Sequence, residues 1–183
     1  MLSVVVLIGL AVGIFRSMAG QRHEVDRLTD AHEAVATTSV ATSRAQSLAR
    51  AGRYDEAIAV LQEAVRTGPY DEGLHYDLGE MMTKHATPDA MIAFFSSEIG
   101  QDEKPQTSHY FWAMGLFRKG DIPGAIAELE RALAIDPAHE MSQRLWGLVL
   151  EKQGQLEAAL DHFVEATRIH PEFRAALQDA ARA

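Results

Sequence analysis

The chain has 183 residues, room for one ordinary domain and an appendage, and its apolar fraction of 47% is enough to bury a core. Its formal net charge of −9, with no stripe of lysine and arginine, argues against nucleic-acid binding. Because the chain has no cysteine, disulfides, thiolate zinc sites, c-type haem attachment and cysteine catalysis are excluded.

The chain begins with an uncharged stretch from Leu2 to Phe15, LSVVVLIGLAVGIF. A helix rises about 1.5 Å per residue, so residues 1–20 would reach about 30 Å, the thickness of the hydrocarbon core of a bilayer. Since its apolar side chains cover every face, such a helix needs lipid or a surrounding core. We therefore predict a single transmembrane anchor over residues 1–20. Its apolar residues are Leu2, Val4, Val5, Val6, Leu7, Ile8, Leu10, Val12, Ile14 and Phe15.

The charges around this stretch favour a retained anchor and predict its orientation. A secretory signal carries positive charge before its apolar run, and no lysine or arginine precedes this one. Arg16, Arg22 and Arg27 follow it instead, and the positive-inside rule keeps such a flank in the cytoplasm. Two alternatives stay open: a signal cleaved after Ser17-Met18-Ala19, and a buried N-terminal helix of a soluble protein.

Residues 21–37 are predicted to form a helical linker, because Val25, Leu28 and Val35 have heptad-like spacing. The linker joins the anchor to the repetitive part of the chain.

From Thr38 onward the sequence repeats every 34 residues without insertion or deletion, in blocks 38–71, 72–105, 106–139 and 140–173. Small residues at the eighth position would let neighbouring helices approach closely. Glycine at the fifteenth position suits the left-handed residue that ends a helix, and proline at the thirty-second stops the next one. Each block therefore predicts two helices, with Thr87 and Asp121 capping the second helix of their blocks. The eighth positions are Ala45, Gly79, Ala113 and Gly147, and the fifteenth are Gly52, Ala86, Gly120 and Gly154.

The fourth block shows the pattern most fully, with Trp146-Gly147, Leu150, Gly154, Ala159, Phe163, Ala166 and Pro171. In this pattern and its recurrence over residues 38–173, the sequence resembles the tetratricopeptide repeat (TPR) family, of a bacterial type with an N-terminal membrane anchor. The resemblance implies an all-α fold, an α-solenoid of four helical hairpins. Residues 174–183 would then form a short capping helix that covers the last apolar face.

Two features depart from the family pattern. Trp112 and Trp146 occupy the seventh position of their blocks instead of the fourth. The second block carries Met91, Glu98 and Glu103 where the pattern has two alanines and a proline, and we expect its second helix to end early, at Gly100.

No residue pattern predicts a catalytic centre. The eight histidines include no pair four residues apart on a helix, and the glycines are spaced as helix ends instead of forming a phosphate-binding loop. We therefore expect no enzymatic activity, no cofactor and no metal.

The resemblance implies that a partner protein binds in a concave groove lined by the first helix of each hairpin. Several groove positions are apolar or aromatic, which suits an amphipathic helix or an extended segment of a partner. The candidate residues are Tyr76, Glu80, Lys84, Tyr110, Met114, Phe117, Arg118, Met141, Arg144 and Leu148. The clamp with which some TPR proteins grip a C-terminal carboxylate cannot form. Its positions hold Thr42, Gln46, Asp77, Thr107 and Phe111.

Together these features predict a scaffold or adaptor tethered to the bacterial inner membrane, with its repeats in the cytoplasm. It would bind other proteins, such as subunits of a membrane complex, and assist the assembly or stability of that complex. Nucleic acid is not expected as a partner. The alternatives are a permanent accessory subunit of a large respiratory or photosynthetic complex, and a periplasmic module released by signal cleavage.

Overall fold

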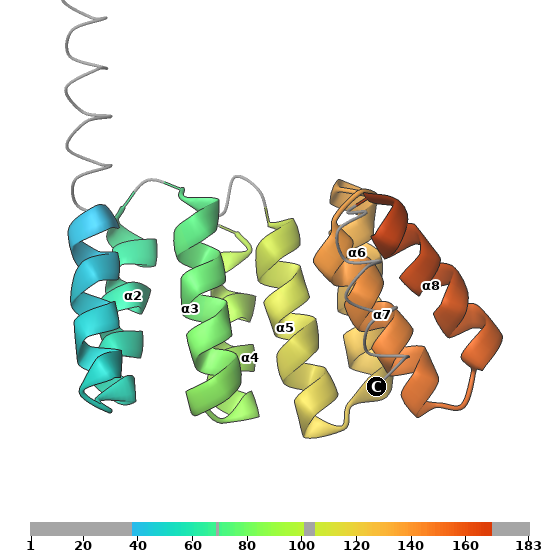
Figure 1. Cartoon of the computed structure of the whole chain (residues 1–183), viewed down its shortest axis with the longest axis horizontal. Helices are drawn as coiled ribbons and strands as arrows, with labels where there is room; N and C mark the ends of the chain where they lie inside the picture. Colours follow the sequence, from blue (N-terminus) through green and yellow to red (C-terminus); the bar gives the residue numbers. More distant parts are fainter. Residues whose placement is uncertain (1–37, 69, 101–104, 170–183) are drawn as a thin grey trace, which may run out of the picture.

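The computed structural model describes residues 38–68, 70–100 and 105–169, and these ranges form an all-α solenoid of eight helices (Figure 1). Residues 38–50 form the first helix of this part of the chain. The others are α2 (Tyr54–Thr67), α3 (Glu72–His85), α4 (Pro88–Glu98), α5 (Gln106–Lys119), α6 (Ile122–Ile135), α7 (Glu140–Lys152) and α8 (Leu156–Ile169).

The predicted anchor over residues 1–20, the linker over 21–37 and the capping helix over 174–183 all lie outside the described ranges. Within those ranges, no helix has both the length and the apolar character needed to cross a bilayer.

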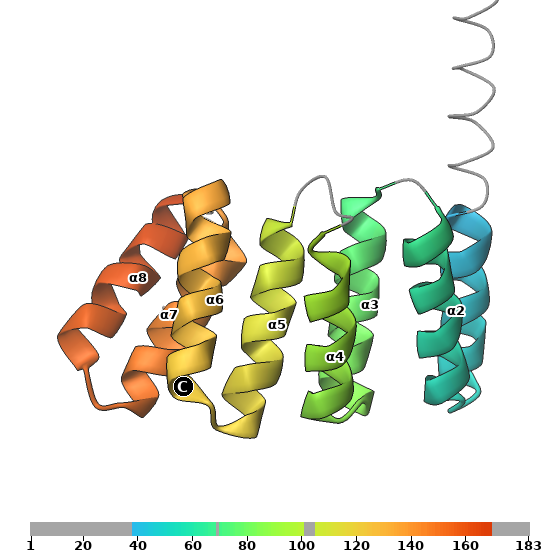
Figure 2. The ribbon, with the colours of Figure 1, turned by 180° about the vertical axis from the view of Figure 1, so that it is seen from behind.

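The helices alternate between two layers. In Figure 1 the first helix, α3 and α5 form the near layer, and the turned view in Figure 2 brings α2, α4 and α6 forward. Each 34-residue block of the sequence contains one helix of the near layer, here called the first layer, and the helix of the second layer that follows it.

The turns within the hairpins follow the glycine pattern. Gly52, Gly120 and Gly154 have φ angles of 74°, 91° and 77°, in the left-handed region that a residue with a Cβ rarely adopts. In the second hairpin Ala86 takes this position with a φ of −98°. The Met82 carbonyl at the end of α3 accepts the backbone amide of Ala86 at 2.9 Å. Arg118 from the next hairpin also donates to the carbonyl oxygens of Met82, at 3.4 Å, and Ala86, at 3.2 Å.

The predicted helix caps are confirmed. The Thr87 hydroxyl accepts a hydrogen bond from the amide of Ala90 at 3.2 Å, and the Asp121 carboxylate accepts one from Gly124 at 3.1 Å. The second helix of the second block also ends early, since α4 ends at Glu98 after 11 residues, two residues before the predicted end at Gly100.

Small residues at the eighth position place helices in direct contact with aromatic rings. A Cβ on Gly79 would lie 2.2 Å from Cζ of Phe111, and one on Gly147 would lie 2.5 Å from Cε1 of Phe163. The ring of Phe111 therefore fills the space that the missing side chain leaves on α3. These contacts are the physical reason for the small residues that recur in the sequence.

The second hairpin is held mainly by its neighbours. Met91, a methionine where the pattern has alanine, is fully buried, and the rings of Phe95 and Phe111 stack with their centroids 5.1 Å apart. Accordingly, α4 packs more extensively against α5 of the next hairpin than against α3 of its own. Glu98, also in place of an alanine, is only 5% exposed and forms an ion pair with Arg66 of the first hairpin at 3.6 Å.

Polar pairs link the two helices of the third and fourth hairpins where the family pattern has tryptophan at the fourth position. His109 Nδ1 lies 2.8 Å from the carboxylate of Glu128, and His162 Nδ1 lies 2.7 Å from the amide oxygen of Gln143. Trp112 stacks on the His109 ring, and Trp146 stacks on His162. The tryptophans at the seventh position thus cover these pairs.

Candidate functional site

The predicted groove residues lie on the first-layer helices but differ widely in exposure. Glu80 and Lys84 are exposed and form an ion pair at 3.0 Å. Leu148 is 38% exposed. The predicted groove residues that are partly buried are Tyr76, Met114, Phe117, Met141 and Arg144.

The expectation that Tyr110 lines an open surface is corrected by its burial. Only 3% of this residue is exposed, because its ring packs 4.7 Å from the centroid of Phe111 and 5.8 Å from that of His139. Burial raises the pKa of the Tyr110 hydroxyl to about 12. Tyr110 therefore packs beneath the predicted groove, and almost none of its surface is exposed for a partner to contact.

Next to Tyr110, the centre of the groove forms a hydrogen-bonded cluster. The Tyr76 hydroxyl lies 2.7 Å from Nε2 of His139, and His139 Nδ1 lies 2.7 Å from the hydroxyl of Ser142. Burial raises the pKa of Tyr76 to about 12 and lowers the pKa of His139. These groups hold α3 and the start of α7 together across the groove.

Two of the predicted groove residues, Arg118 and Phe117, already contact other parts of the chain. The Arg118 guanidinium is bound to the end of α3, as described above. The Lys152 ammonium lies 4.9 Å from the ring centroid of Phe117, a cation–π contact. A partner in this part of the groove would therefore have to displace or cover existing contacts.

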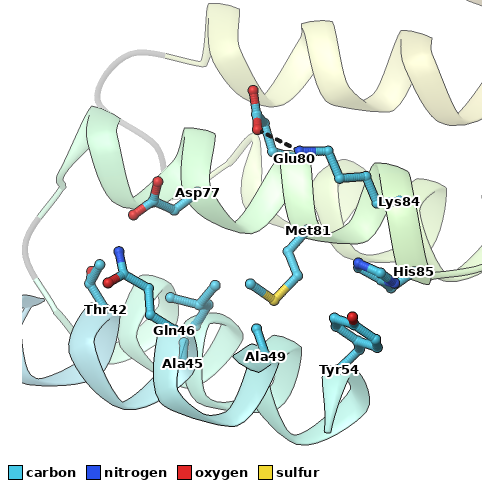
Figure 3. Close-up of a pocket in the computed structure, with 11 residues that line it drawn as sticks. Thr42, Ala45, Gln46, Ala49, Tyr54, Asp77, Glu80, Met81, Lys84 and His85 are labelled. Carbon is cyan, nitrogen blue, oxygen red and sulfur yellow. Dashed lines mark hydrogen bonds and ion pairs between the residues drawn. The ribbon is translucent and has the colours of Figure 1, made fainter. Parts of the chain in front are cut away.

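An open pocket lies further toward the N-terminal end of the described solenoid, between the first helix and α3 (Figure 3). Its volume is about 260 Å³. Its walls combine small and apolar side chains with polar ones at the rim. The lining residues are Thr42, Ala45, Gln46, Ala49, Tyr54, Leu61, Asp77, Glu80, Met81, Lys84 and His85.

The pocket has an aromatic end and a polar end. Tyr54 and His85 stack face to face at one end, with centroids 3.5 Å apart and planes 6° from parallel. Thr42, Gln46 and Asp77 lie at the other end in Figure 3. Partial burial raises the pKa of the Asp77 carboxyl, and the nearby carboxylates of Glu80 and Asp71 raise it further.

Part of this pocket could be predicted from the sequence. Glu80 and Lys84 were among the predicted groove residues, whereas Tyr54, Asp77, Met81 and His85 were not. The sequence does contain a pattern that groups the unpredicted residues of α3. Asp77, Met81 and His85 stand four residues apart and therefore share one face of the helix.

The lining of the pocket combines apolar side chains with polar groups. Over residues 38–68, 70–100 and 105–169, no group of three histidine or carboxylate side chains is arranged to hold a metal ion. The pocket instead offers apolar surface with a few polar groups, an arrangement that suits a ligand held by packing and hydrogen bonds.

Two family models, both described as tetratricopeptide repeat, match residues 39–81 and 111–183, together more than half of the chain. This chain belongs to the TPR family. The match fits the paired helices, the glycine turns and the small residues at the contacts between helices. No curated protein sequence matches the chain.

Solved structures share the TPR fold. MamA is 20% identical, with a TM-score of 0.54, over 70% of this chain and 75% of that one. YrrB, described as a TPR protein with an unusual peptide-binding site, is 20% identical, with a TM-score of 0.55, over 79% and 74%. A thermophilic TPR protein from Thermus thermophilus is 19% identical, with a TM-score of 0.60, over 78% and 80%. At these identities the likeness concerns the fold alone.

Proposed function

We propose that this TPR protein is a scaffold that holds a segment of a partner protein in the pocket between its first helix and α3. The observation that carries the proposal is the open pocket with an apolar floor. Clefts of this kind, with mainly apolar walls and a few polar groups, are typical of binding sites. The TPR fold adds support, because TPR proteins generally serve as interaction modules.

The proposal includes a tether to the cytoplasmic face of a bacterial inner membrane, where the scaffold assists the assembly or stability of a membrane complex. Support comes from the apolar stretch of Leu2 to Phe15 and the arginines that follow it. A tether raises the local concentration of the scaffold near membrane partners, so a weak site would suffice.

Site-specific photo-crosslinking tests the binding surface. Benzoylphenylalanine replaces exposed Lys84 at the pocket rim in one variant and exposed Ala59 on α2 in the control. In cells that make the protein, we expect a discrete crosslinked partner band from position 84 only. This band should disappear when Ala49→Phe fills the pocket. Equal crosslinking from both positions would refute the proposed surface.

Membrane fractionation tests the tether separately. The full chain should sediment with membranes and resist carbonate extraction. The double variant Leu7→Arg and Leu10→Arg should not, because each central charge costs about 3 kcal/mol in a bilayer. A wild-type chain recovered in the soluble fraction would refute the tether and leave the binding site untouched.

A further inference from the structure

A small side chain, Ala49, borders the pocket between the first helix and α3. Gln46 and Ala49 stand at the ninth and twelfth positions of the first block, where the third block has Met114 and Phe117. Met114 and Phe117 pack against the hydrophobic core of the protein. At the twelfth position the first hairpin has alanine instead of a phenylalanine ring, and the pocket opens beside this Ala49.

The floor of this hollow is apolar and already partly dehydrated. Ala45 and Leu61 are buried, and Ala49 and Met81 are partly buried. In Figure 3 the Met81 side chain points toward the alanines across the pocket. An apolar side chain of a ligand would therefore remove further surface from water with little rearrangement.

The polar end of the pocket carries a carboxylate without a counter-ion. Lys84, the one lysine or arginine of the lining, is bound to Glu80. Asp77 has no hydrogen bond or ion pair among the described residues, and its neighbouring charges are carboxylates. A cationic group placed here would be attracted by Asp77, since Glu80 is already paired with Lys84.

From this arrangement we propose that the pocket binds an extended segment of a partner protein in which an aliphatic or methionine side chain adjoins lysine or arginine. The apolar side chain fills the space beside Ala49 and Met81, and the cationic group reaches Asp77. This inference rests on the proposed scaffold function and adds the chemistry of the ligand.

Two synthetic peptide pools test it, each of nonapeptides with random residues at six positions. One pool has Lys-Leu-Lys fixed at the centre, and the other has Glu-Leu-Glu. The detergent-solubilised full-length chain is immobilised, and the amount of each pool retained is measured. We expect the Lys-Leu-Lys pool to be retained at least about threefold more strongly, the effect of one exposed ion pair.

Three variants separate the parts of the inference. Asp77→Asn should remove most of the preference, and Asp77→Lys should reverse it, while Asp161→Asn on α8 serves as a control. Ala49→Phe should abolish retention of both pools, with Ala59→Phe as its control for folding and non-specific adhesion. The helical content and melting temperature of each variant confirm that it is folded.

Each outcome of these experiments supports or overturns a particular part of the inference. Equal retention of the two pools, or a preference unchanged by Asp77→Asn, would overturn the charge recognition. Such a result would leave the scaffold proposal standing if Ala49→Phe still removes the cellular crosslink. Retention of neither pool, or retention unaffected by Ala49→Phe, would overturn the proposed ligand. Self-association of the chain that Ala49→Phe abolishes would identify a second copy as the occupant and would also overturn it.

Discussion

Gly79→Ala should destabilise the protein, although the same change stabilises an ordinary helix. A Cβ at this position would lie 2.2 Å from the Phe111 ring, against about 3.5–4.0 Å for a relaxed carbon contact. The ring would have to move by more than about 1 Å, and it is enclosed by Phe95, Tyr76 and Tyr110. Overpacking of an enclosed core costs about 3 kcal/mol at the upper end of its usual range. The gain in helix propensity from glycine to alanine is about 1 kcal/mol, so we expect a net loss of about 2 kcal/mol.

Urea denaturation followed by far-ultraviolet circular dichroism measures this loss. A double-mutant cycle with Phe111→Leu adds the matched control, because a smaller side chain at 111 makes room for the new methyl group. The double variant should be more stable than the sum of the two single changes predicts. A Gly79→Ala protein as stable as the wild type, or additive behaviour in the cycle, would refute the packing argument.

Three further changes test other parts of the structure. Arg118→Ala removes the donor to the carbonyls at the end of α3 and should cost about 1 kcal/mol in urea unfolding; an unchanged midpoint would contradict this role. Tyr110→Ala removes a buried ring and should lower the free energy of unfolding by about 3–5 kcal/mol, measured in the same way. Any loss of partner binding in this variant would therefore follow from its unfolding. Burial lowers the pKa of His139 and His162 below the ordinary value of 6.5, so below that pH the unfolded chain takes up protons that the folded chain does not. Melting temperatures should therefore fall as the pH drops from about 7.5 to 5.5, and the variant with His139→Gln and His162→Gln should show a smaller drop; an equal drop would contradict the assignment.

The hairpins could be predicted because their signals are local. Glycine before the second helix at Gly52, Gly120 and Gly154, and a cap at Thr87 or Asp121, act within a few residues of the place where they stand. The absence of glycine at Ala86 was visible in the sequence. Its compensation by Arg118 was not, because the two residues lie 32 positions apart and meet only after the hairpins stack.

The site was harder to predict because it depends on how far apart two helices stand. Tyr110 occupies a position that faces the groove in the family, yet the rings of Phe111 and His139 cover it. The pocket lies beside Ala49, where the third hairpin has the larger Phe117 at the same position of its block. Position alone therefore indicated only some of the residues that line the pocket.

The polar pairs between helices explain two departures from the family pattern. His109 pairs with Glu128, and Gln143 pairs with His162, each joining the fourth position of a block to the twenty-third. His109 and Gln143 stand where the family pattern has tryptophan. Each substitution is understandable once its partner is known, because a buried polar group needs a hydrogen-bonding partner.

Hydrogen–deuterium exchange with the crosslinked partner bound tests the account most directly. Because a hairpin of a solenoid packs mainly against its neighbours, stabilisation by a ligand should be strongest near its binding site. We expect slower exchange over residues 38–50 and along α3, with little change in α8. Protection concentrated in α6 and α8, with none over residues 38–50, would contradict the claim that the partner binds in the pocket of the first two hairpins.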